Sequence, residues 1–323
     1  MTPRHTLFLR LGTVLGLAVL AWLLSPAAAA QGTPHVQGAN AASYADQGQY
    51  ERILYGRRQP LGTLPTVRYT TVRLAHPSGN SLRARLALYE AVGEGDAELG
   101  RTRLALAPLL NGREITAMQI GDEIVLPDRP EHFDLDARAF SPFPFYYPGA
   151  GALSKLVVVD LTLQVWAAYA QGELDRWGPV STGKPSTPTP TGRFTMNWRE
   201  EERVSTESPP GEEWLMRWVM NIQQSRGIHM HQYAVPQGAP EGHGCIRMVE
   251  ADARWLWDWA EPRVTTQGVG AKGGRTVRAG TTVIVIGETP ATAPERFGRW
   301  GGQTHRFSVQ LPADPMAVPR GRR

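Results

Sequence analysis

The spacing of apolar residues divides the chain into a helical stretch and a longer β-rich stretch. In the first, Leu82, Leu86 and Tyr89 recur at helical spacing, and Gly93 follows at a position where helices stop. A second helix and two flanking strands are expected around this one. The order strand, helix, helix, strand predicts a small α+β subdomain over residues 66–130. The expected bounds are Val67–Leu74, Leu82–Val92, Arg101–Leu110 and Ile115–Leu126.

The β-rich stretch spans residues 155–287. One helix is expected here, over Val249–Ala260, and Asp252 lies in its first turn, where a carboxylate suits the helix dipole. We therefore predict a mainly β fold, a β-sandwich or barrel with one or two helices, preceded by the α+β subdomain. The expected strands are Leu156–Leu161, Gln164–Tyr169, Leu174–Val180, Arg193–Trp198, Trp214–Ile222 and Thr281–Ile286.

Three segments lack a regular apolar period. Residues 31–65 are rich in Gly, Ala, Gln and Ser, which is typical of a linker. Residues 131–154 contain the proline-aromatic run Phe140–Pro148, which cannot be a regular helix, and we expect its rings to pack on the following domain. Residues 288–323 are rich in Pro, Arg and Gly and predict a flexible tail.

The first 30 residues have the pattern of a secretory signal peptide. Arg4 and Arg10 precede the apolar run Leu11–Leu24, and small residues lead to a cleavage site after Ala30. The run is short for a membrane span, although an uncleaved anchor is the alternative. No other apolar run is long enough to span a bilayer, so the mature protein is expected to be exported and to lack a transmembrane segment.

Charge adds little to this picture. The formal net charge of +4 fits attraction to an anionic polymer such as a cell wall, and it fits solubility alone equally well. The chain has no run of Arg or Lys interleaved with aromatic residues, so nucleic acid is not an expected partner.

Cys245 is the single cysteine of 323 residues, and His229, His231 and His243 lie near it in sequence. In an exported protein it has no partner for an intramolecular disulfide. It can be a nucleophile with an imidazole base, a zinc ligand together with the histidines, or a buried structural residue. A zinc hydrolase would be expected to carry a helical His pair with a nearby Glu, which the sequence lacks.

Local spacing favours the nucleophile. His229 and His231 would share one face of a strand. Cys245 precedes the predicted helix, whose N-terminus would lower the thiol pKa and favour a thiolate–imidazolium pair. Gly242 and Gly244 permit a tight turn that brings amides close to a substrate carbonyl, where they could hold an oxyanion.

These residues resemble the signature of the L,D-transpeptidase catalytic domain, the YkuD family. The signature is matched by Gly227-Ile-His229 and by His243-Gly-Cys-Ile-Arg247. Further likeness lies in Val158-Val-Asp-Leu, Val180-Ser-Thr-Gly-Lys-Pro, Thr189-Pro-Thr-Gly-Arg-Phe and Ala279-Gly-Thr-Thr-Val-Ile-Val. Two positions depart from the family pattern: Gly242 replaces the usual Ser or Thr, and Met230 with the extra His231 follows His229.

The resemblance implies a role for each residue of the motif. Cys245 is the nucleophile and His229 its base, with His231 as the other possible base. His243 shapes the site and binds substrate, and Gly244 with Cys245 supplies oxyanion amides. Arg247 binds a stem-peptide carboxylate or pairs with a structural acid. The remaining substrate-binding candidates are His231, Tyr233 and Gly242.

The resemblance also implies a reaction. The donor would be a peptidoglycan tetrapeptide stem, joined through a Cys acyl-enzyme to an amine of another stem in a 3–3 cross-link, with no cofactor and no metal. Water as acceptor would give a carboxypeptidase, and a catalytically silent peptidoglycan-binding protein is the alternative from another class. Leu109-Leu-Asn-Gly and Ile120–Pro127 resemble part of a LysM domain, which implies glycan strands as a further partner.

Overall fold

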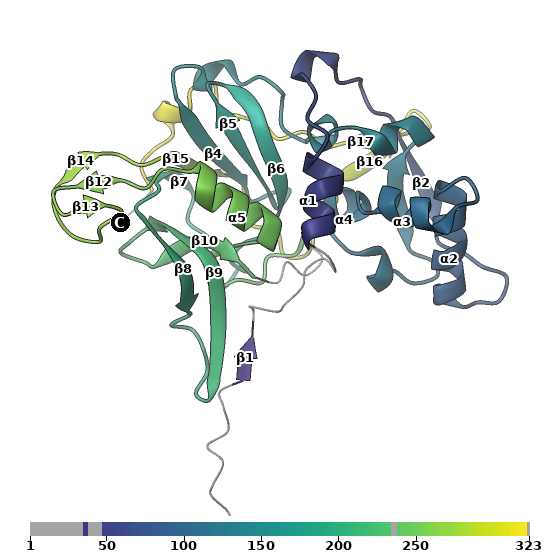
Figure 1. The fold of residues 1–323 in the computed structure, drawn as a ribbon, viewed down its shortest axis with the longest axis horizontal. Coiled ribbons are helices and arrows are strands. Elements are labelled where there is room, and N and C mark those ends of the chain that lie inside the picture. Colours follow the sequence, from purple (N-terminus) through teal and green to yellow (C-terminus); the bar gives the residue numbers. More distant parts are fainter. Residues whose placement is uncertain (1–34, 38–46, 234–237, 322–323) are drawn as a thin grey trace, which may run out of the picture. The chain divides into compact units, whose positions relative to one another are not determined.

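The computed structural model describes residues 35–37, 47–233 and 238–321, all within one compact unit, His35–Arg323 (Figure 1). The mainly β prediction is confirmed, because strands outnumber and outspan the helices in this part of the chain. The signal-peptide prediction falls on residues 1–30, outside the described residues. Within the described ranges, no helix is both long and apolar enough to cross a membrane.

A ten-stranded sheet forms the β-rich region. Its strand order is β1-β9-β10-β11-β6-β5-β4-β15-β7, and β8 pairs with β9 off this path. Most neighbours are antiparallel, while β1 with β9, β4 with β15 and β10 with β11 are parallel. The strands are β1 (His35–Gln37), β4 (Lys155–Asp160), β5 (Val165–Ala170), β6 (Glu173–Ser181), β7 (Gly192–Thr195), β8 (Trp198–Val204), β9 (Glu212–Gln223), β10 (Ile228–Gln232), β11 (Ile246–Met248) and β15 (Thr282–Ile286).

The central strands are buried on both faces. Leu156 and Val158 of β4 join one apolar core, and Val157 and Val159 join the other. A strand covered on both sides has no polar face, so its sequence is a continuous apolar run rather than an alternating one. This explains why β4, β5 and β15 could be recognised from composition alone.

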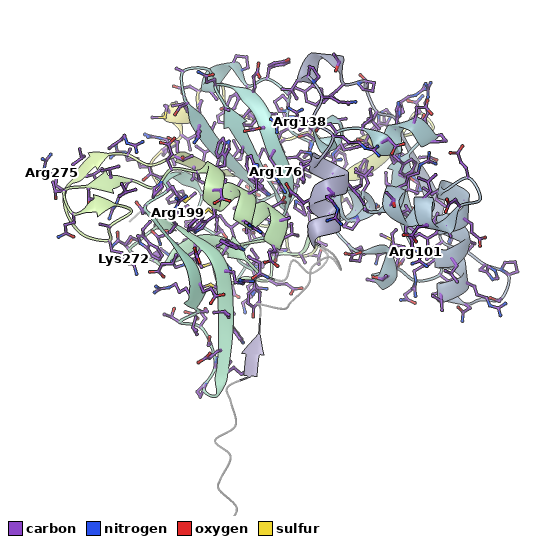
Figure 2. All side chains as sticks on the ribbon, in the orientation of Figure 1. Arg101, Arg138, Arg176, Arg199, Lys272 and Arg275 are labelled. Atoms are coloured by element: carbon purple, nitrogen blue, oxygen red, sulfur yellow. The ribbon has the colours of Figure 1, made fainter. Side chains whose placement is uncertain are left out.

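Helix α5 (Glu250–Trp259) covers one face of the sheet, against β9 and β10 (Figure 1). Ala253 and Leu256 enter the second core from this helix, as its predicted apolar face requires. Asp252 is fully buried, and its Oδ1 accepts from Arg176 Nη2 at 2.7 Å. Its main partner is therefore a buried guanidinium on β6, labelled in Figure 2, and not the dipole of the helix alone.

The region 66–130 has the predicted order of elements and its own core, which includes Leu88, Leu104 and Ile124. The elements are β2 (Tyr69–Arg73), α2 (Ser81–Val92), α3 (Ala97–Leu104), α4 (Ala107–Asn111) and β3 (Glu123–Pro127). Two predicted bounds were wrong. The second helix is split in two because Pro108 fits only the first turn of a helix. The last strand begins at Glu123, after a turn at Gly121, whose φ is 91°.

The linker prediction for residues 31–65 was wrong from Gln47 onward. Residues Gln47–Tyr55 form α1, which packs on α5 and buries Tyr50 and Leu54 in the first core. Within the same segment, β1 pairs with β9. Composition was a poor guide because the few apolar residues of α1 pack on a core that distant segments of the chain supply.

The flexible-tail prediction for residues 288–323 was also wrong for the described part. A hairpin of β16 (Phe297–Trp300) and β17 (Gln303–Arg306) extends the β2–β3 pair into a four-stranded sheet. Val309 beyond it is buried in the first core. The tail therefore connects the α+β subdomain with the large sheet.

The proline-aromatic segment packs on the large sheet as expected. Phe140, Phe143 and Tyr147 are buried in the first core, and Trp177 Nε1 of β6 donates to Ala137 O at 2.7 Å. The backbone is not extended throughout but forms 3-10 turns at Pro130–Asp134, Ala137–Phe140 and Pro148–Ala150.

Strand β11, which follows Cys245, was not predicted, and neither were β8, β12, β13 and β14. The hairpin β8–β9 continues past the sheet, with residues 205–211 as its turn. A separate three-stranded sheet follows α5. It consists of β12 (Val264–Thr265), β13 (Gly268–Val269) and β14 (Thr276–Arg278).

Candidate active site

Two parallel strands bring the thiol and an imidazole together. His229 lies on β10, and Cys245 immediately precedes β11, which pairs with β10 through Met230 and Ile246. Cys245 Sγ is 3.7 Å from His229 Nδ1, and its thiol donates to Gly227 O at 3.5 Å. A proton can therefore pass from Sγ to Nδ1 without a mediating group, provided that the neutral ring carries its own proton on Nε2.

A bulge in the sheet aims His229 at the thiol. The register between β9 and β10 shifts between Ile228 and His229. Buried Asn221 supports this irregularity, since its Nδ2 donates to Gln223 O and Ile228 O, both at 3.3 Å. The ring of Trp198 packs beside His229, with centroids 5.1 Å apart. The imidazole is held between a packed indole and a hydrogen-bonded turn.

Burial sets the resting protonation of the pair. Burial, followed by the positive charge of Arg203, lowers the pKa of His229 to about 4. Burial raises the pKa of the Cys245 thiol, although the main-chain amide of His229 and the charge of Arg247 act in the opposite direction. Both shifts favour a neutral thiol beside a neutral imidazole at neutral pH.

The expected lowering of the thiol pKa by a helix N-terminus is thus contradicted. Strand β11 separates Cys245 from α5, which begins only at Glu250. The field of a helix terminus acts within about one turn, so it is weak at this distance. Desolvation of the thiolate dominates instead.

His231, the other possible base, is 3% exposed and lines the same cavity. Its Nδ1 lies 2.9 Å from Gln232 O, and burial lowers its pKa to about 3. The hydrogen bonds of the described residues include none between His231 and Cys245. Geometry therefore favours His229 as the group that receives the proton.

A cavity of about 170 Å³ opens in front of the thiol. His243, which is exposed, stacks on Trp214 of β9 with ring centroids 5.9 Å apart. The cavity walls come from the β8–β9 hairpin, the turn before β10, β10 itself and the Cys245 loop. The lining residues are Arg203, Ser205, Thr206, Glu207, Trp214, Met216, Arg226, Gly227, His229, His231, Tyr233, His243, Cys245 and Arg247.

Arg247 and Tyr233 form one wall. The guanidinium carbon of Arg247 lies 4.9 Å from the Tyr233 ring centre, and its Nη2 donates to Glu241 O at 3.2 Å. No ion pair links Arg247 to a carboxylate of the described residues. Arg247 was predicted either to bind a stem-peptide carboxylate or to pair with a structural acid. Among the described residues it pairs with no acid, and its guanidinium faces the cavity.

Gly242 does not line the cavity, unlike the other predicted substrate-binding residues. It is buried, and its amide donates to Thr182 O at 2.8 Å. A Cβ at this position would lie 2.9 Å from Cys245 O and 3.0 Å from Thr182 O. The hydroxyl residue that the family pattern would place here does not fit this backbone, so Gly242 serves packing.

The amides of Gly244 and Cys245 are the predicted oxyanion donors. Gly244 has a φ of 112°, which favours glycine, and a Cβ there would approach Ile228 Cδ1 to 3.0 Å. The hydrogen bonds of the described residues include none donated by these two amides. Of the two residues, Cys245 lines the cavity and Gly244 is buried behind it.

Sequence reasoning missed the part of the site that the β8–β9 hairpin contributes, including Trp214, Arg203 and Trp198. The signal was present in Ser208-Pro-Pro-Gly211, a turn sequence between two strand-like runs. In the part of the chain that is described, no group of three or more His, Cys, Asp or Glu side chains is placed to hold a metal ion.

Residues 154–285 match the family model for YkuD, the L,D-transpeptidase catalytic domain. Probable L,D-transpeptidase 3 of Mycobacterium tuberculosis is 30% identical over 92 residues, which cover 25% of this chain and 34% of that protein. Putative L,D-transpeptidase YkuD of Bacillus subtilis is 24% identical over 152 residues, which cover 46% of this chain and 77% of that protein. The chain thus spans about a third of the mycobacterial relative's length.

A solved structure of an L,D-transpeptidase from Mycobacterium smegmatis is also similar, with 26% identity and a TM-score of 0.32 over 41% of this chain and 58% of its own. The family model begins one residue before and ends two residues before the region 155–287 that the motifs outlined. Motifs and family model agree on the same stretch of sequence. The chain therefore contains an L,D-transpeptidase catalytic domain of the YkuD family at residues 154–285.

Proposed function

We propose that this protein is a periplasmic cysteine L,D-transpeptidase that acts on peptidoglycan stem peptides. The observation that carries the proposal is the 3.7 Å approach of Cys245 Sγ to His229 Nδ1 at the wall of a cavity inside the family domain. A nucleophile and a base within reach of each other are the minimum that acyl transfer requires. The predicted signal peptide would bring the enzyme to the compartment that contains the wall.

The first half of the reaction forms an acyl-enzyme. Sγ attacks the carbonyl at the L-centre of the third stem residue, and its proton passes to His229 Nδ1. The C–S bond forms, and the carbonyl oxygen becomes an oxyanion that the Gly244 and Cys245 amides stabilise. The oxyanion then collapses, the C–N bond breaks, and His229 returns the proton to the nitrogen of the departing D-alanine.

The second half transfers the acyl group. An amine of another stem attacks the thioester, His229 takes its proton, and the C–S bond breaks to restore the thiol. The product is a 3–3 cross-link. If water replaces the amine, the same steps give an L,D-carboxypeptidase, which is our alternative within the enzyme class. The third possibility is a wall-binding protein without turnover.

Charge around the cavity fits an anionic donor. Arg247 and Arg226 both line it, and neither forms an ion pair within the described residues. The cavity lining contains one carboxylate, that of Glu207. Stem peptides carry free carboxylates, which unpaired guanidiniums bind well. We extend the proposal to Arg247 as a group that holds a stem carboxylate. Glycan binding by residues 66–130 remains a prediction from the weak LysM resemblance.

The test is intact-mass spectrometry of the protein with purified muropeptides and, separately, with a carbapenem. We expect an acyl adduct on Cys245 and a cross-linked or trimmed muropeptide product. Cys245→Ala should form neither, and His229→Ala should lose turnover by about 100-fold or more. His231→Ala is the matched control. A larger loss in His231→Ala than in His229→Ala would show that the base is misassigned, and unmodified wild-type protein would contradict the enzyme proposal.

A further inference from the structure

The catalytic turn Gly242–Cys245 rests on a second loop that contains no residue of the catalytic pair. This loop runs from Thr182 to Thr189 and lies behind the turn. A Cβ on Gly183 would come within 2.8 Å of Gly244 Cα, so the two backbones are in direct contact. The loop therefore can hold the turn only through main-chain groups and short polar side chains.

Thr189 supplies the central contact. Its hydroxyl accepts from the Gly183 amide at 2.9 Å and donates to the Gly244 carbonyl at 2.8 Å. The residue is 2% exposed, so both bonds are shielded from water. A single hydroxyl thus joins the supporting loop to the peptide unit that immediately precedes the nucleophile.

The orientation of that peptide unit matters for catalysis. The Gly244 carbonyl and the Cys245 amide belong to one planar trans peptide, in which C=O and N–H point in opposite directions. When the carbonyl is fixed on Thr189, the N–H must point away from the supporting loop. Cys245 lines the cavity and Thr189 does not. The contact therefore directs the Cys245 amide toward the substrate side.

Such a restraint is needed because glycine flanks the turn. Gly244 adopts a φ of 112°, and glycine has alternative conformations of similar energy that would rotate this peptide. The family pattern would place a hydroxyl residue at position 242, where this backbone has no room. The Thr189 hydroxyl instead reaches the turn from the opposite loop, at the Gly244 carbonyl.

We propose that Thr189 is a positioning residue that sets the oxyanion hole by fixing the Gly244–Cys245 peptide. This inference rests on the proposed use of Cys245 as an acyl nucleophile. It does not require that the substrate be a stem peptide. Thr189 acts through the backbone and touches neither the thiol nor the cavity.

The test compares two reactions of Cys245 in the full-length protein. p-Nitrophenyl acetate acylates the thiol through a tetrahedral oxyanion and releases p-nitrophenolate. Iodoacetamide alkylates it by displacement of iodide, without an oxyanion. Because Cys245 is the single cysteine, the part of each rate that is lost in Cys245→Ala belongs to this thiol, and only that part is compared. The ratio of acylation rate to alkylation rate is therefore a measure of the oxyanion hole that cancels changes in folding, thiol access and ionisation.

For Thr189→Val we expect the ratio to fall by about 10- to 100-fold, the range for a displaced oxyanion donor. Thr189→Ser keeps the hydroxyl and should stay within about threefold of wild type, and Thr189→Ala should resemble the valine variant. Thr187→Val is the matched control. Its hydroxyl donates to Gly242 O at 3.1 Å, but the Lys184 amide holds the same carbonyl at 2.9 Å. Its ratio should not change.

A ratio for Thr189→Val within about threefold of wild type would overturn the proposal, because the oxyanion hole would then be set without the hydroxyl. An equal fall in both rates would also overturn it, since that result indicates loss of the loop and not of one amide. If the valine variant does not fold, Thr189→Ser and Thr189→Ala decide on the same ratio. Failure of wild-type protein to process muropeptides would refute the proposed function while leaving this ratio measurable.

Discussion

We expect Cys245 to rest as a neutral thiol, and the pH dependence of its reactivity tests this expectation. The motif alone suggested a thiolate beside an imidazolium. In the structure, burial raises the pKa of Cys245 above its ordinary value and lowers that of His229 to about 4. The perturbation that separates the two descriptions is pH, with the rate of alkylation as the readout.

The expected difference is large. An ordinary thiol with a pKa of about 8.5 is only about 3% ionised at pH 7 and about 0.3% at pH 6. Burial raises the pKa of Cys245, so its ionised fraction is smaller still. A preformed ion pair would be almost fully ionised at both. Since the thiolate is the reactive species, the two descriptions differ by about three orders of magnitude in alkylation rate at pH 6.

The assay is pseudo-first-order alkylation by iodoacetamide, followed by intact mass, from about pH 5 to 9.5. We expect the rate to rise about tenfold per pH unit up to pH 9, without a plateau near neutrality. His229→Ala should leave this profile nearly unchanged, because His229 does not hold the thiol proton at rest. A plateau below pH 7 in wild type that disappears in His229→Ala would refute the reasoning from burial.

Two further changes test the packing around the site. Arg176→Met leaves Asp252 buried without its cation, which should destabilise the fold by about 3–5 kcal/mol in chemical unfolding. Burial already raises the Asp252 pKa to about 6, and loss of the guanidinium should raise this pKa further. A carboxyl whose pKa is raised in the folded state stabilises the fold less as pH rises through that pKa. The loss of stability in Arg176→Met should therefore be larger near pH 8 than near pH 5. Gly242→Ser should lower both melting temperature and acylation, at a cost of about 1–3 kcal/mol, because its Cβ would meet Cys245 O and Thr182 O. A serine variant as stable and active as wild type would show that the backbone around position 242 shifts at little energetic cost and would contradict this prediction.

The sequence was most informative where an element is buried on all sides. The β4 run Leu156–Val159 is apolar without interruption because each of its faces enters a different core. Its identity as a strand follows from composition, and the order of such strands with the Cys245 motif sufficed to indicate the family. Local pattern and tertiary structure agree there, since burial leaves no choice of residue type.

The sequence was least informative where a residue is explained by a distant partner. Tyr50 and Leu54 lie in a segment of linker-like composition, yet they dock on a core whose other buried members are at least 52 residues away in sequence. The prediction of a lowered thiol pKa failed for the same reason. The shift depends on how much protein surrounds Cys245 and not on which element follows it. Neither quantity is a property of a local window of sequence.

The charge network of Arg176 shows how far the functional unit extends beyond the family domain. Arg176 and Asp252 both lie within residues 154–285, but the guanidinium also binds Glu51 of α1, with Nη2 to Oε2 at 2.6 Å. The Tyr55 ring lies 3.7 Å from the same guanidinium, and its hydroxyl donates to Trp177 O at 2.5 Å. Since Arg176 is 1% exposed, α1 shields a buried cation that the family domain cannot cover by itself. Helix α5, which begins two residues after β11, is held by this network, so α1 supports the strand that follows Cys245 from outside the matched region.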